Sequence, residues 1–130
     1  MAALLAIAMV FAQTVDRHED ADPVPTDEET ATVEAPPPPP SPHAYLYAAY
    51  PALARKLDCM IQGESTWYPW ASGAGGRYVG LAQFDFPTWL STPQGKAGLL
   101  RTDPYASIDA MAWGVVHLGY GRWPVTSRRC

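Results

Sequence analysis

The sequence predicts a small, mainly α-helical domain with little or no β-sheet, and three observations lead to this prediction. The chain has 130 residues, which is the size of one domain. Apolar residues recur at helical spacing in two stretches, one ending near Glu64 and one within 104–118. The stretch 66–80 is rich in glycine and aromatic residues, so we expect a mobile loop or a short hairpin there.

The first long helix is expected to take Pro51 as an early residue and to end at Glu64 or Ser65. Its apolar stripe consists of Leu53, Leu57, Met60 and Ile61. A short lead-in helix, packed on the core, is expected from the tyrosines that precede it, Tyr45, Tyr47 and Tyr50.

Two further helices are predicted. A short one starts at Phe86 and stops before Pro93, and a polar loop over 94–98 follows it. The last helix has Asp103 as its cap and Gly119 as its stop. Its apolar stripe consists of Ile108, Met111, Val115 and Leu118.

Composition divides the chain at about residue 44. Residues 13–43 contain eight acids, one arginine, the proline run 36–40 and no Phe, Tyr or Trp, which predicts a disordered acidic linker. Residues 44–130 contain eight Lys or Arg against five acids, a formal charge of +3, and are predicted to be the folded domain. A mildly basic domain suits an anionic polymer, although we expect no nucleic-acid partner.

Residues 1–12 form an apolar leader that is too short to span a bilayer. A secretory signal peptide accounts for it, with small residues at Val10 and Ala12 before the cleavage point. No Lys or Arg precedes the apolar run, so the alternatives are a start upstream of Met1 or a leader that is not processed. The expected product is a secreted or cell-wall monomer without a stable membrane span.

The two cysteines, Cys59 and Cys130, are consistent with export. A disulfide between them closes a loop of about 70 residues and stabilises a small domain by about 4 kcal/mol in the loop-entropy model. The alternative is a pair of unrelated free thiols. Two cysteines and one histidine outside the linker, His117, do not make a structural zinc site, so we expect no metal.

Glu64 is the strongest candidate for chemistry. It follows Leu53 by about three helical turns, so its carboxyl lies on nearly the same face as the leucines. A carboxyl at the edge of a core face loses solvation, which disfavours its charged form and suits a proton donor to a glycosidic oxygen. The alternative is an exposed, solvated Glu at a helix end.

Aromatic residues crowd the sequence around Glu64, and sugar rings stack on aromatic faces. Trp67 and Trp70 have the better claim to a sugar because they follow Glu64 in an irregular segment. Tyr78 is a further candidate from the same region. Trp89 and Trp113 are expected in the core, because both lie in helices with apolar neighbours.

Four pieces of sequence now stand in order: Glu64-Ser65-Thr66-Trp67, Gly80-Leu81-Ala82-Gln83-Phe84, Pro87-Thr88-Trp89 and the stretch from Asp103-Pro104 to Ala110. This series resembles the lysozyme-like superfamily in its lytic transglycosylase branch. Resuscitation-promoting factors look similar, given the small size, the ending Trp123-Pro124 and the candidate disulfide. The resemblance covers residues 53–130.

The resemblance implies roles for individual residues. Glu64 is the expected catalytic acid, and Ser65 is expected to steady it by hydrogen bonding. The Gly-Leu-x-Gln motif lines the cleft in the family, so Gly80, Leu81 and Gln83 are expected to bind substrate. Gln83 as an ordinary polar loop residue is the alternative.

The implied activity is cleavage of the β-1,4 bond between N-acetylmuramic acid and N-acetylglucosamine in peptidoglycan, without a cofactor. Asp85 is the only other acid near the cleft motif, and capping of the helix at Pro87 accounts for it equally. A single-acid mechanism that forms 1,6-anhydromuramic ends is therefore expected. The alternatives are a hydrolytic muramidase and a non-catalytic peptidoglycan-binding module.

Overall fold

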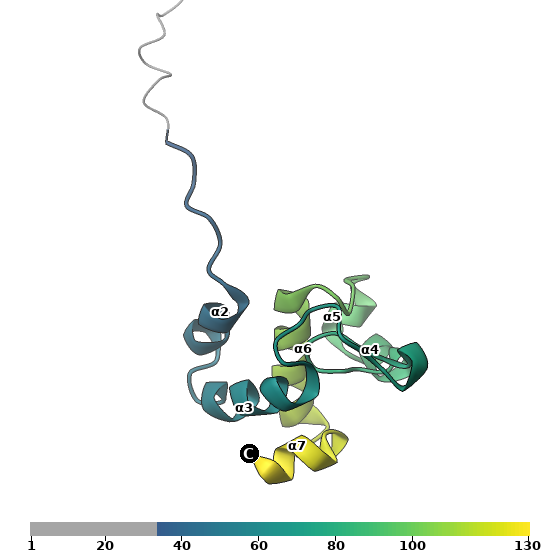
Figure 1. Ribbon diagram of the computed structural model, residues 1–130. Coiled ribbons are helices and arrows are strands. Elements are labelled where there is room, and N and C mark those ends of the chain that lie inside the picture. Colours follow the sequence, from purple (N-terminus) through teal and green to yellow (C-terminus); the bar gives the residue numbers. More distant parts are fainter. Residues whose placement is uncertain (1–33) are drawn as a thin grey trace, which may run out of the picture. The chain divides into compact units, whose positions relative to one another are not determined.

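The order of helices and strands confirms a mainly helical domain. The computed structural model describes residues 34–130, and Pro39–Cys130 form one compact unit. The predicted leader, 1–12, and most of the predicted linker, 13–33, lie outside the described residues. The elements are α2 (Pro42–Ala49), α3 (Ala54–Ser65), β1 (Ser72–Gly73), η2 (Ala74–Gly76), β2 (Tyr78–Val79), α4 (Phe86–Ser91), α5 (Pro93–Lys96), α6 (Pro104–His117), η3 (Tyr120–Arg122) and α7 (Pro124–Arg129) (Figure 1).

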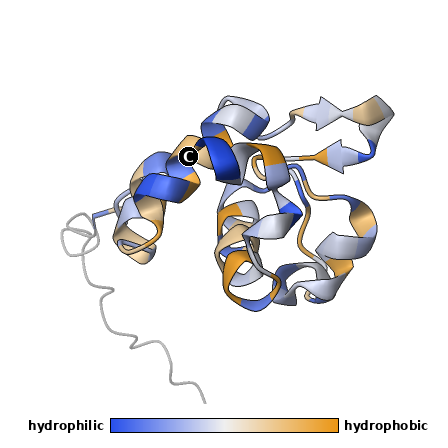
Figure 2. Ribbon diagram, turned by 90° about the horizontal axis from the view of Figure 1, so that it is seen from below, coloured by the Kyte–Doolittle hydropathy of each residue, from blue (hydrophilic) through white to orange (hydrophobic). Residues whose placement is uncertain are grey.

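The only sheet in the described residues is a hairpin of two short antiparallel strands. Ser72 of β1 pairs with Val79 of β2, and Gly73 pairs with Tyr78. Figure 2 shows this hairpin at the edge of the helical body. The glycine-rich stretch 66–80 therefore forms the short hairpin that was one of its two predicted conformations.

Helix α6 runs through the core and is buried on more than one face. Its buried residues are Ala106, Ser107, Ile108, Ala110, Met111, Ala112, Gly114 and Val115. The small residues let neighbouring segments approach closely: a Cβ on Gly114 would lie 2.9 Å from Cη2 of Trp123. Asp103 caps the helix as predicted, because its Oδ1 accepts hydrogen bonds from the backbone N–H groups of Tyr105 and Ala106.

Helix α2 is joined to the core by tyrosine hydroxyls. Tyr45 and Tyr50 both donate to Oδ1 of Asp109 on α6, at 2.7 and 2.6 Å. The hydrogen bond to Asp109, together with burial and the carboxylate's charge, raises the pKa of Tyr45 to about 12. The predicted lead-in helix is therefore present and tied to α6.

Local bonding moves the start of α3 by three residues from the predicted position. Pro51 lies in a turn in which the backbone N–H groups of Leu53 and Ala54 both donate to the carbonyl of Tyr50. The helix proper begins at Ala54 and ends at Ser65. Its end agrees with the prediction, and Leu57, Met60 and Ile61 are fully buried.

Two expectations were wrong in detail, and the tail after Gly119, for which no element was predicted, forms η3 and α7. The polar loop over 94–98 is partly the short helix α5, which Thr92 caps by accepting a hydrogen bond from the backbone of Gly95. Trp113 is only partly buried and stacks on His117 with ring centroids 4.6 Å apart, whereas Trp89 lies in the core as predicted.

The predicted disulfide is present. Cys59 on α3 is bonded to Cys130, which directly follows α7, and the two residues are 71 positions apart in sequence. The bond fixes the end of the chain to the middle of α3. No helix within residues 34–130 is long and apolar enough to cross a membrane.

Replacing both cysteines, in Cys59→Ser with Cys130→Ser, is expected to lower the free energy of unfolding by about 4 kcal/mol, because the unfolded chain regains the entropy of a loop of this length. Urea unfolding of the variant and of the wild type, with and without reductant, measures the loss. The reduced wild type serves as the control and should match the variant. Equal stability of oxidised wild type and variant would contradict the expectation.

Candidate active site

Glu64 lies in the last turn of α3, and its carboxyl is half-buried and engaged on one side only. The hydroxyl of Thr126 on α7 donates to Oε1 of Glu64 at 2.7 Å. Among the described residues, no hydrogen bond to Oε2 is formed. The carboxyl is thus held in place through one oxygen while the other is left for a ligand.

Helices α3 and α7 approach each other closely at this point. A Cβ on Gly63 would lie 2.9 Å from Cγ2 of Thr126, so glycine is the residue that admits the threonine methyl group. Thr126 itself is 4% exposed. Its one side chain therefore packs against Gly63 and bonds to Glu64.

Sequence reasoning missed Thr126, although a signal for it existed. Cys59 lies five residues before Glu64, and Cys130 lies four residues after Thr126. A disulfide between those cysteines brings the segments before it and after it together. A helical tail would then place Thr126 about one turn from the bond, next to Glu64.

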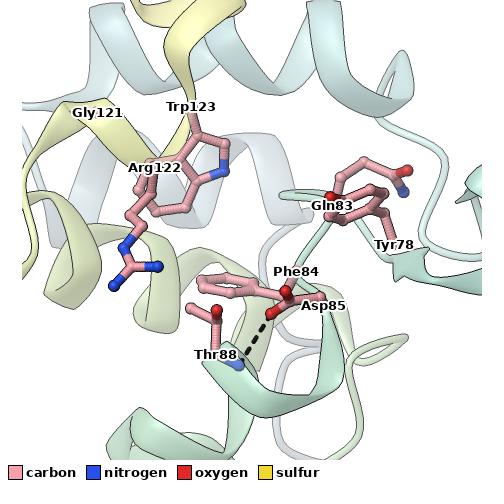
Figure 3. A pocket seen from close by; sticks show the side chains of 8 residues that line it. All are labelled: Tyr78, Gln83, Phe84, Asp85, Thr88, Gly121, Arg122 and Trp123. Atoms are coloured by element: carbon pink, nitrogen blue, oxygen red, sulfur yellow. Dashed lines mark hydrogen bonds between the residues drawn. The ribbon is translucent and has the colours of Figure 1, made fainter.

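A groove runs past Glu64. One hollow of about 370 Å³ is lined by Gly63, Glu64, Tyr78, Gln83, Arg122, Trp123, Pro124, Val125, Thr126 and Arg129. A second hollow of about 260 Å³ is lined by Tyr78, Gln83, Phe84, Asp85, Thr88, Gly121, Arg122 and Trp123 (Figure 3). Four residues line both hollows, so the two are adjacent, and together they are here called the Glu64 groove.

The two sides of the Glu64 groove come from distant parts of the chain. Figure 3 shows Arg122 and Trp123 on one side of the second hollow and Tyr78 and Gln83 on the other. Trp123 is held by its indole N–H, which donates to the carbonyl of Ala82 at 2.8 Å. Gln83 and Tyr78, two of the predicted site residues, therefore both line the groove.

Hydrogen bonds hold the Gln83 side chain in place. Its Nε2 donates to the backbone carbonyls of Ala71 and Gly80, at 3.0 and 2.9 Å, and its backbone has a φ of 50°. Both amide protons are therefore used within the protein. The side chain is a fixed part of the groove wall, and its two hydrogen bonds join parts of the loop to each other.

Three other predicted site residues lie behind the groove. Ser65 is buried, and its hydroxyl donates to the carbonyl of Ile61 in the same helix. Leu81 is 1% exposed and belongs to the core. Gly80 is also buried, and a Cβ there would lie 2.1 Å from the carbonyl oxygen of Arg101. The structure gives these residues packing contacts, and they do not line the groove.

The two predicted stacking tryptophans are also outside the groove lining. Trp67 is half-buried; its indole N–H donates to Oδ1 of Asp58, and its ring centroid lies 5.1 Å from that of His43. Trp70 is 63% exposed and lies beside Tyr68, with ring centroids 5.8 Å apart. Of the two tryptophans, Trp70 is the exposed one.

Asp58 holds the strained turn that follows Glu64. Thr66 and Trp67 both have positive φ, 51° and 60°, a costly conformation for residues with a Cβ. Burial opposes the charged form of Asp58, but hydrogen bonds from Tyr47, Trp67 and His43 outweigh it and hold its pKa below the usual range. The ionised carboxylate thus keeps the indole, and the turn that carries it, in one position.

Asp85, the other acid of the groove, caps α4 as predicted. Its side chain accepts a hydrogen bond from the backbone N–H of Thr88 at 2.9 Å. Hydrogen bonding to Thr88 lowers the pKa of Asp85; burial opposes this effect, and the nearby charges of Arg77 and Arg122 add to it. The lowered pKa therefore favours the ionised form of Asp85 in the groove.

Comparison of the chain with protein-family models, with curated proteins and with solved structures gives no match. The resemblance to lysozyme-like proteins therefore rests on the four sequence pieces alone. Within residues 34–130, no group of three or more His, Cys, Asp or Glu side chains is placed to hold a metal ion.

Gly80→Ala is expected to lower the free energy of unfolding by more than about 3 kcal/mol, because the residue has a φ of +94° and no room for a Cβ. Gly98→Ala is the matched control, since Gly98 has a φ of +83° but open space around it, and its expected cost is about 1 kcal/mol. Urea unfolding of both variants separates backbone strain from the clash. Equal losses would show that the contact with Arg101 is unimportant.

Proposed function

We propose that the domain is a peptidoglycan lytic transglycosylase in which Glu64 is the general acid and base. The observation that carries this proposal is a half-buried carboxyl on the lining of a hollow of about 370 Å³, with Oε1 held by Thr126 and Oε2 without a hydrogen bond in the described residues. A second hollow lies beside the first and shares four lining residues with it, so the two together offer room for more than one sugar ring. The four sequence pieces support a glycan as the substrate.

The groove walls carry the kinds of groups that bind sugars. Tyr78 supplies aromatic surface opposite the nearly buried Trp123, and Arg122 and the carboxylate of Asp85 supply polar partners for hydroxyl and acetamido groups. The fixed orientation of Gln83 and Trp123 lowers the entropy lost when a substrate is ordered. The arrangement favours a chain of sugar rings that crosses Glu64.

In the proposed reaction, Oε2 of Glu64 donates its proton to the oxygen that links N-acetylmuramic acid to N-acetylglucosamine. The bond from the muramic C1 to that oxygen breaks, and positive charge develops at C1. The ionised Glu64 then removes the proton of the muramic 6-hydroxyl, whose oxygen attacks C1 and closes a 1,6-anhydro ring. The acid is thereby restored, and no water is consumed.

A hydrolytic muramidase is the second candidate, and the position of Asp85 favours it. This carboxylate, whose pKa is lowered, lines the hollow beside the one that contains Glu64. A carboxylate on the substrate face opposite the acid can activate a water, as in inverting glycosidases. Engagement of Asp85 with Thr88 at the start of α4 argues for the transglycosylase instead.

Incubation of purified peptidoglycan with the full chain, wild type beside Glu64→Gln, tests the proposal. Mass spectrometry of soluble muropeptides from the wild type should show ends that are lighter by one water than hydrolysis products. Glu64→Gln preserves shape but lacks an ionisable proton, and is expected to release fragments about 10²- to 10⁴-fold more slowly.

The same experiment separates the alternatives. Reducing muramic ends would identify a muramidase and rule out the transglycosylase. Binding to the wall material without any fragment from the wild type would identify a non-catalytic module. Asp85→Asn, assayed in parallel, should keep the anhydro product, and its inactivity would make Asp85 part of the chemistry.

Thr126 is expected to act as a positioning residue for Glu64. Thr126→Val keeps the methyl group beside Gly63 but removes the hydroxyl that donates to Oε1. Loss of a hydrogen bond to a charged group predicts a fall in kcat of roughly 10- to 100-fold, with little change in KM. Steady-state kinetics on soluble glycan strands measures both constants.

Thr126→Ser is the matched control, because it keeps the hydroxyl and loses the methyl group. Its kcat should be close to that of the wild type, even if the packing against Gly63 is looser. If kcat falls as far in Thr126→Ser as in Thr126→Val, the methyl group and its packing, and not the hydroxyl, account for the role of Thr126.

A further inference from the structure

Two arginines belong to the lining of the Glu64 groove, and the mechanism above does not use them. Arg122 ends η3 and lines both hollows, and Arg129 ends α7 and lines the hollow that contains Glu64. We propose that Arg122 and Arg129 bind carboxylates of the stem peptides, so that the groove selects peptide-bearing glycan strands. This inference rests on the proposed function, because it specifies the substrate of the same groove.

Three other cations of the domain contact groups within it. Lys56 lies 4.3 Å from the ring centroid of Tyr120, and the guanidinium of Arg77 lies 5.3 Å from that of Tyr78. Arg101 donates to the backbone carbonyls of Arg77 and Phe84. None of these three side chains lines the Glu64 groove.

Arg122 and Arg129 differ from those cations. Within residues 34–130, the ion pair formed is that of His43 with Asp58, so neither arginine has a carboxylate within ion-pair distance. Both side chains are exposed, and in Figure 3 the guanidinium group of Arg122 extends beside the hollow, away from the ring of Trp123. Two unpaired guanidinium groups on one groove form a site for anions.

The two acids of the groove do not form ion pairs with these arginines. Glu64 accepts a hydrogen bond from Thr126 through Oε1 and forms no ion pair with either arginine. The positive charge of Arg122 helps to lower the pKa of Asp85. The side chain of Asp85, however, accepts a hydrogen bond from the backbone N–H of Thr88. A guanidinium group binds a carboxylate through two parallel hydrogen bonds, so an external carboxylate is the best partner for each arginine.

The chemistry of the polymer identifies the carboxylates. In a peptide-bearing strand the lactyl carboxyl of muramic acid is consumed in the amide bond to the stem, so the free carboxylates are those of the peptide. Stems project from the sugar backbone, and the arginines are exposed at the groove rather than buried in its floor. Neutral polymers of N-acetylglucosamine offer no such group and should bind weakly.

Binding can be tested without turnover by using the full chain with Glu64→Gln as the parent. Cosedimentation is measured with intact sacculi, with sacculi whose carboxyls have been amidated, and with amidase-treated glycan that has lost its stems and carries free lactyl carboxylates. Arg122→Gln and Arg129→Gln are compared with Arg128→Gln. Arg128 is the matched control, because it lies next to Arg129 on α7 but does not line the groove.

On intact sacculi, Arg122→Gln and Arg129→Gln are each expected to weaken binding about three- to tenfold, and Arg128→Gln to leave it unchanged. The parent should bind amidated sacculi and stem-free glycan as weakly as the double arginine variant binds intact sacculi. An equal loss of binding in Arg128→Gln would show that general charge attraction, and not a specific site, holds the protein on the sacculi. Stem-free glycan bound as tightly as intact sacculi would assign the arginines to lactyl carboxylates and overturn the proposal.

This design distinguishes a failure of the transglycosylase proposal from a failure of the arginine proposal. The cosedimentation assay uses a variant with no acid at position 64, so its outcome does not depend on catalysis. Absence of anhydro products from the wild type would remove the transglycosylase and leave the measured selectivity for stem carboxylates in place. Normal turnover with equal binding to all three polymers would remove only the arginine site.

Discussion

The contact between α3 and α7 is the constraint on which the candidate active site depends. Three features act at this contact: the disulfide between Cys59 and Cys130, the glycine at position 63, and the hydrogen bond from Thr126 to Glu64. The disulfide limits how far α7 can move from α3, and the glycine sets how closely the two helices approach. At that distance the hydroxyl of Thr126 reaches the carboxyl of Glu64 and fixes its position. Because α7 also supplies groove lining, the same contact shapes the groove.

Trp123 connects this contact to the core. Its indole N–H bonds to Ala82, its ring fits against Gly114 of α6, and its centroid lies 5.6 Å from that of Phe84. Phe84 in turn packs edge-on against Trp89. The groove floor is therefore continuous with the hydrophobic core, and its geometry is as well defined as the core packing.

Structural features that depend on a few neighbouring residues could be predicted from the sequence, whereas features that depend on tertiary contacts could not. Periodicity and local caps predicted the end of α3, the cap Asp103 and the cap Asp85, because those features are set within a few residues. The helices α5 and α7 were missed, since four and six residues carry little periodicity and tertiary contacts decide their formation.

The candidate site shows the same division. Glu64, Tyr78 and Gln83 were selected by chemistry and by resemblance, and the structure places all three on one groove. Ser65, Leu81 and Gly80 came from the same motifs but face the interior, because a motif records neighbours in sequence and not the direction of each side chain. Thr126, Arg122 and Arg129 lie about 60 residues from Glu64 and belong to no motif, so only the folded chain brings them to it.

The place of α7 has a practical consequence for handling the protein. Any affinity tag or fluorescent fusion added after Cys130 begins two residues beyond Arg129, which lines the Glu64 groove. Such an addition places its own bulk and charges beside that groove. Tags placed before Pro39 join the chain outside the compact unit.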